Sequence, residues 1–268
     1  MKVNKIERKS RLVPAIAILV ALAATAVGAV FAYGKLRDLY LEQCVITDMV
    51  RQVEISAGKM VKADVIAENL GLRPGANLAT IDFEQRREDL LKRVPNLLSI
   101  RITRKLPDRV IVAAEERTPV ARLMSKDRNA GVGRVVDTEG VVFVWQRGTQ
   151  NLPVIREPQC TPRGERIRGR TLAALRLVEA CREPEFLELG VQDVDTQKHD
   201  FLTATLGNYS RVKILWDGMD EQTPDSKIDL TRRLTNLRDT IRSNVSPSTV
   251  IWNATIPNRI FADRQEKP

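Results

Sequence analysis

The sequence has few of the side chains that most often carry catalysis or bind transition metals. Its 268 residues include one histidine, His199, and three cysteines, Cys44, Cys160 and Cys181. A catalytic triad needs a base within reach of a nucleophile and an orienting acid, and nothing near His199 in the sequence offers those partners. A zinc or iron site would have to consist mostly of carboxylates, and the sequence shows no such cluster. We therefore expect no enzymatic activity, no bound metal and no cofactor.

Three scattered cysteines are also too few for a disulfide framework, although the pairing of Cys160 with Cys181 stays open. A phosphate-binding loop is missing, because the glycines of residues 71–75 lack its spacing and its Lys-Ser/Thr ending. Aromatic residues make up 4% of the chain and do not interleave with basic ones, which argues against a binder of single-stranded nucleic acid. We expect neither a nucleic acid nor a small-molecule substrate.

One long apolar run covers residues 13–33 and contains no charged side chain. A helix of this length spans about 31 Å, close to the hydrocarbon core of a bilayer. A basic flank against a single acidic residue, Glu7, precedes it, and such a flank normally stays in the cytoplasm. The basic residues are Lys2, Lys5, Arg8, Lys9 and Arg11, and they supply part of the formal net charge of +9. The sequence predicts a single-pass protein in the lipid bilayer, with the N-terminus cytoplasmic and the rest outside.

A cleavable signal peptide is the alternative, because Ala24, Thr25 and Ala26 form an A-x-A pattern. The apolar run continues past Ala26 to Phe31, which is longer than the apolar region of a signal peptide needs to be. We therefore favour an uncleaved anchor.

Six parts are predicted along an α+β chain. They are a cytoplasmic tail (1–12), a transmembrane helix (13–33), a stalk or helical continuation (34–48), a small module (49–118), a mixed α/β domain with a mostly antiparallel sheet (119–262) and a C-terminal tail (263–268).

In the small module, apolar positions of residues 50–55, Val50 included, predict a first strand, and residues 63–70 a helix that Gly71 ends. Asp82 is placed to cap a second helix. Two strands follow around a turn at residues 106–108, so the order is strand, helix, helix, strand, strand.

The larger domain is predicted to begin with a hairpin at residues 134–144. Its further elements are an extended piece at 152–155, an exposed loop at 158–170, a helix at 171–182, an antiparallel meander at 191–194, 201–206 and 211–216, a helix from Ser226, and strands at 248–252 and 259–262.

Several motifs resemble those of a known family. The chain resembles a POTRA module at residues 71–78 (G-L-R-P-G-A-N-L), at Ile81-Asp82, at Val94-Pro95 and along the strand through Ile100 and Ile102 to Leu106-Pro107. Residues 116–121 (E-R-T-P-V-A) resemble the E-R-x-P-v-A junction of the FtsQ/DivIB cell division proteins. Residues 136–143 (V-D-T-E-G-V-V-F) resemble their v-D-x-x-G-x-v-f hairpin. With the anchor, the resemblance covers residues 12–155.

Membership of this family implies a non-enzymatic scaffold of the divisome that links early and late division proteins during septal wall synthesis. It implies a place in the bacterial inner membrane, enriched at the septum, and binding of FtsB/FtsL-type (DivIC-type) bitopic coiled-coil proteins. In the family the main partner surface lies on the last strands, where Val250, Trp252, Ile260 and Phe261 are candidates here. Trp252 and Phe261 have an equal alternative, that they complete the core. Pro257 departs from the family pattern, because it interrupts the expected pairing strand.

The family motifs also mark residues expected to be structural: Gly71, Gly75, Arg117, Pro119, Asp137 and Gly140. We expect the first two glycines to serve turns and Pro119 to fix the path of the chain between domains. We expect Arg117 to pair with an acid inside the small module.

Two other functions are alternatives to the scaffold. A POTRA-bearing component of outer-membrane protein export would usually end in a barrel of strands about 10 residues long. A secreted, signal-cleaved hydrolase is the less favoured alternative, and it would lack residues 1–26.

Overall fold

A computed structural model describes residues 7–125, 133–146, 148–221, 223–243 and 251–263, with side chains from residue 19 onward. The first part of the predicted cytoplasmic tail and the C-terminal tail from residue 264 lie outside these ranges. By their contacts the residues form two compact units. The first comprises Met1–Ser56, Ala63–Arg87 and Arg101–Ala113, and the second comprises Ala57–Lys62, Glu88–Ile100 and Ala114–Pro268.

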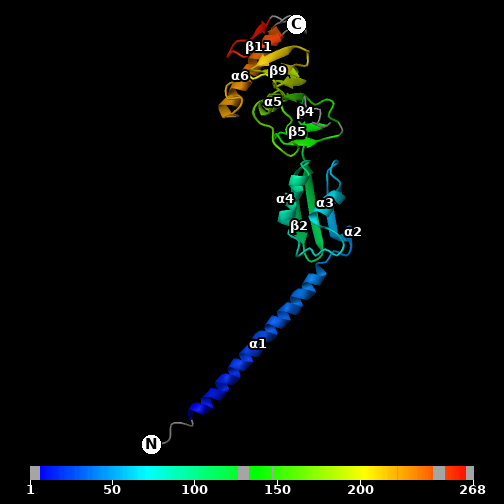
Figure 1. Cartoon of the computed structure of the whole chain (residues 1–268), viewed down its shortest axis with the longest axis vertical. Helices are drawn as coiled ribbons and strands as arrows, with labels where there is room; N and C mark the ends of the chain where they lie inside the picture. The colour runs from blue at the N-terminus through cyan, green and yellow to red at the C-terminus, as the bar shows by residue number, and fades with distance from the viewer. Residues whose placement is uncertain (1–6, 126–132, 147, 222, 244–250, 264–268) are drawn as a thin grey trace. The chain divides into compact units, whose positions relative to one another are not determined.

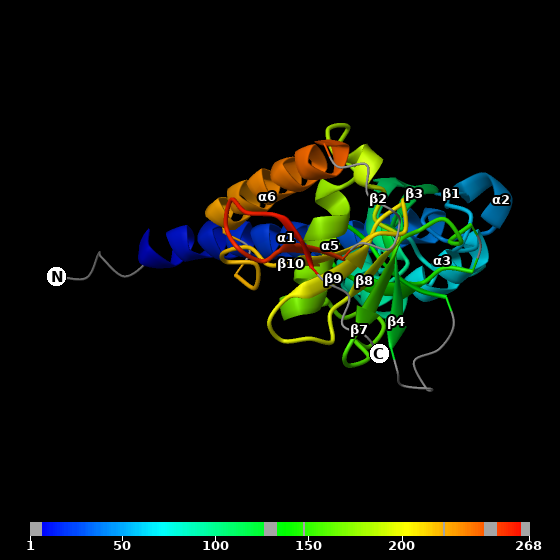
Figure 2. The ribbon, with the colours of Figure 1, turned by 90° about the horizontal axis from the view of Figure 1, so that it is seen from above.

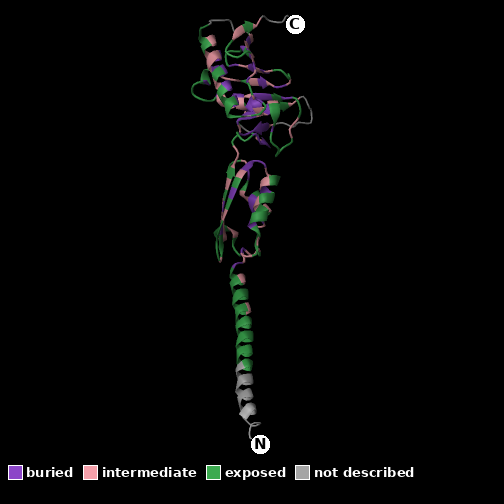
Figure 3. Cartoon of the chain, turned by 90° about the vertical axis from the view of Figure 1, so that its left-hand side faces the viewer, coloured by how far each residue is buried: buried purple, intermediate pink, exposed green. Residues whose placement is uncertain are grey.

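The chain begins with α1 (Glu7–Gln43), one continuous helix drawn in blue in Figure 1. Its part from Leu19 to Gln43 is long and apolar enough to cross a membrane, and its most apolar stretch is fully exposed (Figure 3). No second helix in the described ranges passes that test. The predicted span at residues 13–33 lies inside α1, and the predicted helical continuation reaches Gln43.

Residues 75–78 hold the end of α1. Backbone hydrogen bonds of 2.8 Å join Cys44 and Ile46 to this loop, and both side chains are fully buried. Asn77 donates from Nδ2 to the carbonyl oxygen of Leu41 at 2.7 Å, which satisfies one of the free carbonyls at the helix end. The helix and the loop are therefore joined without a flexible linker.

A three-stranded sheet with the order β1-β3-β2 follows. Its module consists of α2 (Met49–Gln52), β1 (Val53–Ser56), α3 (Ala63–Leu70), α4 (Phe83–Arg93), β2 (Leu97–Lys105) and β3 (Arg109–Glu116). β1 pairs with β3 in parallel, with Val53 opposite Val110, through a crossover that contains both larger helices. The predicted order of strands and helices is confirmed, with α2 as an addition.

The prediction for Val50 was wrong, because this residue lies in α2 and not in the first strand. Asp48 accepts hydrogen bonds from the backbone N–H groups of Val50 and Arg51, which starts a helical turn. The Val50 side chain is 92% exposed, so no core contact opposes the turn.

The predicted helix ends are confirmed. Gly71 has φ +72° and donates its N–H to the carbonyl of Glu68, as expected of a residue that ends a helix in the left-handed conformation. Asp82 Oδ1 accepts the N–H groups of Glu84 and Gln85 at 3.1 Å each, which caps α4.

A nine-stranded sheet forms the rest of the chain, in the order β12-β11-β10-β9-β8-β7-β4-β5-β6. The strands are β4 (Ala121–Ser125), β5 (Arg134–Val136), β6 (Val142–Val144), β7 (Val154–Glu157), β8 (Asp193–Asp195), β9 (Leu202–Thr205), β10 (Arg211–Ile214), β11 (Ile251–Ala254) and β12 (Phe261–Asp263). Most neighbours are antiparallel, as predicted, while β4 with β7, β7 with β8 and β10 with β11 run parallel. The β5–β6 hairpin and the β8–β9–β10 meander are confirmed.

Two features of this sheet differ from the prediction. β4 was not expected, although it is an interior strand that pairs with both β5 and β7. Pro257 does not interrupt a strand, because it lies in the connection between β11 and β12, where Asn258 has φ +56°. A turn is a position where the missing N–H of proline costs nothing.

Both long helices of this unit, α5 (Gly169–Ala180) and α6 (Pro224–Ser243), pack on one face of the sheet (Figure 1 and Figure 2). A short 3-10 helix, η1 (Leu187–Leu189), follows α5. Leu175 of α5 and Leu234 of α6 share a core cluster with Val194 and Val212 of the strands. The other face of the sheet carries a mixture of polar, charged and apolar side chains, among them Arg156, Lys213 and Phe261.

Candidate partner-binding edge of the nine-stranded sheet

The nine-stranded sheet has two edge strands, and the edge at β6 is covered. Val142 donates its N–H to Glu165 at 2.9 Å and accepts the N–H of Gly164 at 2.8 Å. Asn96 donates from Nδ2 to the carbonyl of Val144 at 2.7 Å. Both backbone groups of Val142 and the carbonyl of Val144 are thus satisfied within the chain, which leaves this edge less suited to strand addition.

The edge at β12 is open. β12 pairs antiparallel with β11, with Phe261 opposite Asn253 and Asp263 opposite Ile251. On its outer side no strand of the described part of the chain pairs with it. An antiparallel edge strand directs alternate N–H and C=O groups outward, so β12 offers a template for one more strand.

Side chains at the open edge present an aromatic ring and charges. Phe261 and Asp263 lie on the face of the sheet opposite the helices and are half-buried. Lys213 donates from Nζ to Asp263 Oδ2 at 2.8 Å, and the guanidinium of Arg259 lies 5.9 Å from the centre of the Phe261 ring. The edge therefore combines an apolar contact point with a basic rim.

A single row of side chains connects this edge to the far strands on the same face. In cross-strand register the row is Met124, Arg156, Asp195, Thr203, Lys213, Asn253 and Phe261. Met124 is 47% exposed, but it lies on an interior strand. It therefore resembles Phe261 in face and apolar character, but its strand has partners on both sides.

Two buried charged residues of α6 hold β11 in place. Arg233 donates from Nη1 to the carbonyls of Ala254 and Thr255 at 3.2 Å each. Its Nε donates to Asp229 Oδ2 at 2.9 Å, and Asp229 also accepts the backbone N–H of Asp217 at 3.1 Å. Burial alone would raise the pKa of Asp229, but these hydrogen bonds and the nearby guanidinium groups lower it.

Asp229 and Arg233 were missed by the sequence reading. Their signal is a pair of opposite charges four residues apart, next to the apolar stripe of Leu230 and Leu234 on the inner face of the helix. An amphipathic helix normally keeps such charges on its outer face. Charges at this position suggest a buried anchoring role.

The four predicted partner residues are not equivalent. Val250 lies outside the described residues. Trp252 is 4% exposed and belongs to the core, so its alternative role, completing the core, is the one that the structure supports. Ile260 packs partly against the same core, and Phe261 lies on β12.

The comparison with known families concerns the small module that precedes this sheet in the sequence. A family model described as the POTRA domain, FtsQ-type, matches residues 49–117. The chain carries an FtsQ-type POTRA domain. The domain follows an N-terminal apolar helix that is long enough to cross a membrane. A search of curated proteins found no match to the chain.

This domain supports a role in cell division through protein–protein interaction, and the apolar helix supports a single-pass membrane protein. The matched residues run from the start of α2 to one residue beyond β3. The open edge at β12 lies outside the match.

The last POTRA residue, Arg117, contacts acids of the β5–β6 hairpin inside the second unit. Its Nη1 donates to Asp137 and, at 3.1 Å, to Glu139 Oε2. We expected an acid within the POTRA domain, and that expectation was wrong, because both partners lie after Pro119. The pairing could not be predicted from local sequence, because the acids lie about 20 residues downstream of Arg117.

The hairpin turn presents Asp137 in a fixed conformation. Asp137 Oδ1 accepts the N–H of Val141 at 2.8 Å, and its carbonyl accepts the N–H of Gly140 at 3.1 Å. Gly140 has φ +80°, and a Cβ there would stand 3.2 Å from Ile167. Glycine is therefore required both by the backbone conformation and by close packing.

Glu116, the residue before Arg117, holds a POTRA loop and was not singled out from the sequence. Its carboxylate accepts the backbone N–H groups of Lys59, Met60 and Val61 at 3.0, 2.8 and 2.6 Å. Its only sequence signal is the glutamate of the E-R-x-P motif.

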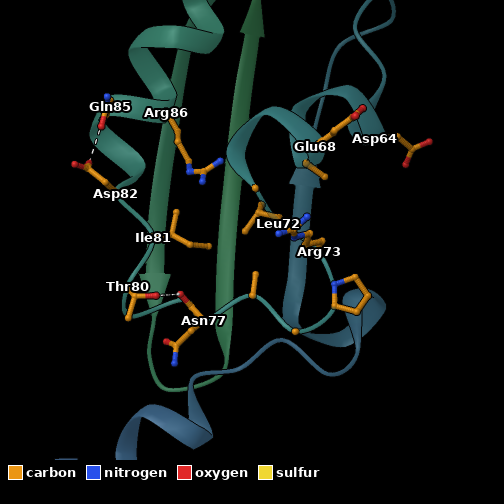
Figure 4. A pocket seen from close by; sticks show the side chains of 15 residues that line it. Asp64, Glu68, Leu72, Arg73, Asn77, Thr80, Ile81, Asp82, Gln85 and Arg86 are labelled. Atoms are coloured by element: carbon orange, nitrogen blue, oxygen red, sulfur yellow. Dashed lines mark hydrogen bonds between the residues drawn. The ribbon is translucent and has the colours of Figure 1, made fainter.

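Gly71 and Gly75 line a cleft of the POTRA domain, about 1120 Å³ in volume and open to solvent. Figure 4 shows Asp64 and Glu68 on one side of it and Arg86 on the other. The rim therefore carries charges of both signs. Within the described residues no group of three or more His, Cys, Asp or Glu is placed to hold a metal ion.

Proposed function

We propose that this chain is a non-enzymatic divisome scaffold that links early and late division proteins during septal wall synthesis. It binds FtsB/FtsL-type (DivIC-type) single-pass proteins by accepting a strand of the partner at β12. The observation that carries the proposal is the difference between the two sheet edges, β6 covered by its own chain and β12 open. A partner strand could pair with β12 on the side where no strand of the described residues does.

Support also comes from the N-terminal part. The FtsQ-type POTRA domain and the apolar helix fit a protein that acts in division at a membrane. The basic flank before residue 13 favours a cytoplasmic N-terminus, with both folded parts on the outer side of the bacterial inner membrane. The proposed division role adds that the protein gathers at the septum.

The outer-membrane export alternative has less support. The strands of a transmembrane barrel are about 10 residues long. Among the described residues after the POTRA domain the longest strand is β4, with 5 residues, and two helices cover one face of the sheet.

A pair of matched variants tests the open edge. Phe261→Lys places a charge on the edge strand, and Met124→Lys places the same charge in the same row on an interior strand. The full-length proteins are purified from detergent-solubilised membranes, and co-purified single-pass proteins are quantified by mass spectrometry. We expect Phe261→Lys to lower recovery of FtsB/FtsL-type proteins about tenfold and Met124→Lys to leave it unchanged. Equal recovery with both variants would refute the edge as the docking site.

The division role has its own test. Depletion of the protein is expected to give filamentous cells, and a fluorescent fusion is expected to gather at mid-cell. A uniform envelope signal in normally dividing cells would contradict the proposal.

A further inference from the structure

The end of the POTRA domain at which α1 joins it carries exposed apolar side chains. Val50 of α2 is 92% exposed, and Leu106, in the turn between β2 and β3, is 42% exposed. The third exposed large apolar side chain of residues 49–117, Val65, lies in the first turn of α3. Two of the three therefore lie where the domain follows the apolar helix.

Backbone pairing places α2, the β2–β3 turn and the end of α1 together. β1 runs parallel to β3 with Val53 opposite Val110, so α2, which directly precedes β1, lies beside the residues that precede β3. α1 ends at Gln43, and α2 begins at Met49. All these residues belong to the first compact unit, and Figure 1 and Figure 4 show the turn at the same end of the domain as the end of α1.

Basic side chains flank the turn. Lys105 is the last residue of β2 and Arg109 the first residue of β3, and both are exposed. Lys105 lies five residues after the buried Ile100 and Arg109 one residue before the buried Val110, so both point to the face of the sheet away from the core. Within the described residues no ion pair joins either of them to an acid, Asp108 of the turn included. Like charges on neighbouring strands repel each other, so an anion beside them would be stabilising.

The turn lies within reach of the bilayer surface. The uncharged run of α1 ends at Tyr33, ten residues before Gln43. Ten helical residues span about 15 Å. Headgroups take up about 5–7 Å of this length, and the remainder is close to the range of surface charges, about 8 Å at physiological salt. A tilt of α1, which membrane helices commonly show, brings one side of the domain closer still.

The joint between α1 and the domain keeps this end turned toward the membrane. Cys44 and Ile46 are fully buried and bonded to residues 75–78, so no flexible linker lets the domain swing away. Exposed apolar side chains with cations beside them suit the boundary between headgroups and acyl chains, where the apolar part is buried and the charged ends stay at the headgroups. Anionic headgroups would supply the charge that Lys105 and Arg109 do not find in the chain itself.

We infer that the POTRA domain docks on the bilayer surface through Val50 and Leu106, with anionic phospholipid headgroups bound at Lys105 and Arg109. The membrane then holds the domain at two places, through α1 and through this end of the sheet. The inference goes beyond the proposed function and does not depend on strand addition at β12.

Fluorescence quenching in proteoliposomes tests the docking with the full-length chain. A nitrobenzoxadiazole label is attached to Val50→Cys, Leu106→Cys or, as the control, Glu115→Cys, each combined with Cys160→Ser. Glu115 is exposed and lies about 20 Å along β3 from Arg109. The vesicles contain phosphatidylcholine, phosphatidylglycerol and a lipid with a nitroxide on its headgroup. We expect quenching about threefold stronger at positions 50 and 106 than at 115. Equal quenching at all three positions would overturn the inference.

Vesicles of phosphatidylcholine and the nitroxide lipid alone separate headgroup charge from contact in general. Without phosphatidylglycerol, quenching at positions 50 and 106 should fall toward the level at position 115, and high salt should have the same effect on the mixed vesicles. Unchanged quenching without phosphatidylglycerol would overturn the assignment of anionic headgroups.

Charge reversal tests the two basic residues themselves. Lys105→Glu with Arg109→Glu should lower quenching at position 50 about threefold, because each basic side chain near an anionic surface adds attraction. Lys92→Glu with Arg93→Glu is the matched control. These two exposed residues end α4, close to the start of β2 and therefore at its other end from Lys105. The control should leave quenching unchanged, and equal quenching in the two double variants would overturn the role of Lys105 and Arg109.

Discussion

Arg117 and Asp137 form an ion pair across 20 residues of sequence, with side chains only 13 and 5% exposed. The pair joins the last residue of the POTRA match to the turn of the first hairpin of the large sheet. Glu139 shares the same guanidinium, and Arg166 shares Glu139. The E-R-x-P motif therefore marks a site of long-range contacts as well as a change of chain direction.

Breaking this pair should destabilise the second unit. Arg117→Met keeps an apolar stem but leaves the carboxylate of Asp137 buried without its cation, which typically costs about 3 kcal/mol of unfolding free energy. The measurement is urea unfolding of the full chain in detergent, followed by tryptophan fluorescence. All three tryptophans, Trp145, Trp216 and Trp252, lie after the POTRA domain and report on this unit.

Arg166→Met is the matched control. Arg166 also binds Glu139, but its side chain is 65% exposed, so the expected loss is below about 1 kcal/mol. The double variant Arg117→Met with Asp137→Asn should lose less than the sum of the single changes, because the second change removes the buried charge. Equal losses for Arg117→Met and Arg166→Met would show that the buried pair does not stabilise the unit.

Glu116→Gln should loosen the POTRA loop at residues 59–61. The carboxylate accepts three backbone N–H groups there, and an amide would turn one of its acceptors into a donor facing a donor. Hydrogen bonds to a charged group contribute more than neutral ones, so we expect a loss of about 2 kcal/mol in local stability. Hydrogen–deuterium exchange of the peptide that covers residues 57–62 should accelerate accordingly.

Two further variants sharpen this test. Glu115→Gln should leave the exchange unchanged, because Glu115 is exposed and accepts only the hydroxyl of Ser99. Gly58→Ala should accelerate exchange as Glu116→Gln does, because its Cβ would stand 2.1 Å from the carboxyl carbon of Glu116. Unchanged exchange in both Glu116→Gln and Gly58→Ala would mean that the carboxylate does not order the loop.

Local chemistry made much of the fold predictable. Gly71 ends α3, Asp82 caps α4 and Gly140 closes the hairpin because each position depends on residues within one turn of itself. The strand prediction for Val50 was wrong for the same kind of local reason. Asp48, two residues earlier, provides a cap, and that short-range signal outweighed the strand preference of valine.

Long-range pairing was not predictable in the same way. β4 gave no alternating pattern that stood out, and its place between β5 and β7 depends on a parallel partner about 30 residues away. The acid partners of Arg117 and the backbone partners of Glu116 are likewise distant in sequence. At the candidate edge, Phe261 was predicted, but the difference between an open β12 and a covered β6 depends on segments that only the fold brings together.

Acid should weaken the support that α6 gives to β11. Because the folded-state pKa of Asp229 is lowered, its ionised form stabilises the fold at neutral pH, and this contribution is lost as the pH falls below the ordinary value of 3.8. Asp229→Asn should therefore cost about 2 kcal/mol near neutral pH, and the difference from the native chain should shrink in acid. Unfolding free energies from about pH 6 down to about pH 3 measure both curves.

Asp225→Asn serves as the control for this titration. Asp225 lies in the first turn of the same helix and is exposed, so it should not change how stability depends on pH. If the gap between the native chain and Asp229→Asn stays constant through the acid range, the carboxylate of Asp229 does not stabilise the fold through its charge.

Thiol labelling should distinguish the three cysteines. Burial raises the pKa of Cys181 to about 12, so at about pH 8 only about one molecule in ten thousand presents the reactive thiolate. Cys44 is fully buried, whereas Cys160 is only partly so. We expect a maleimide to modify Cys160 first and the other two only after unfolding, as followed by intact mass. Cys160→Ser should abolish the fast phase. If the native chain shows no fast labelling phase until a reductant is added, Cys160 is in a disulfide. That result would contradict the structure, in which all three cysteines are free thiols.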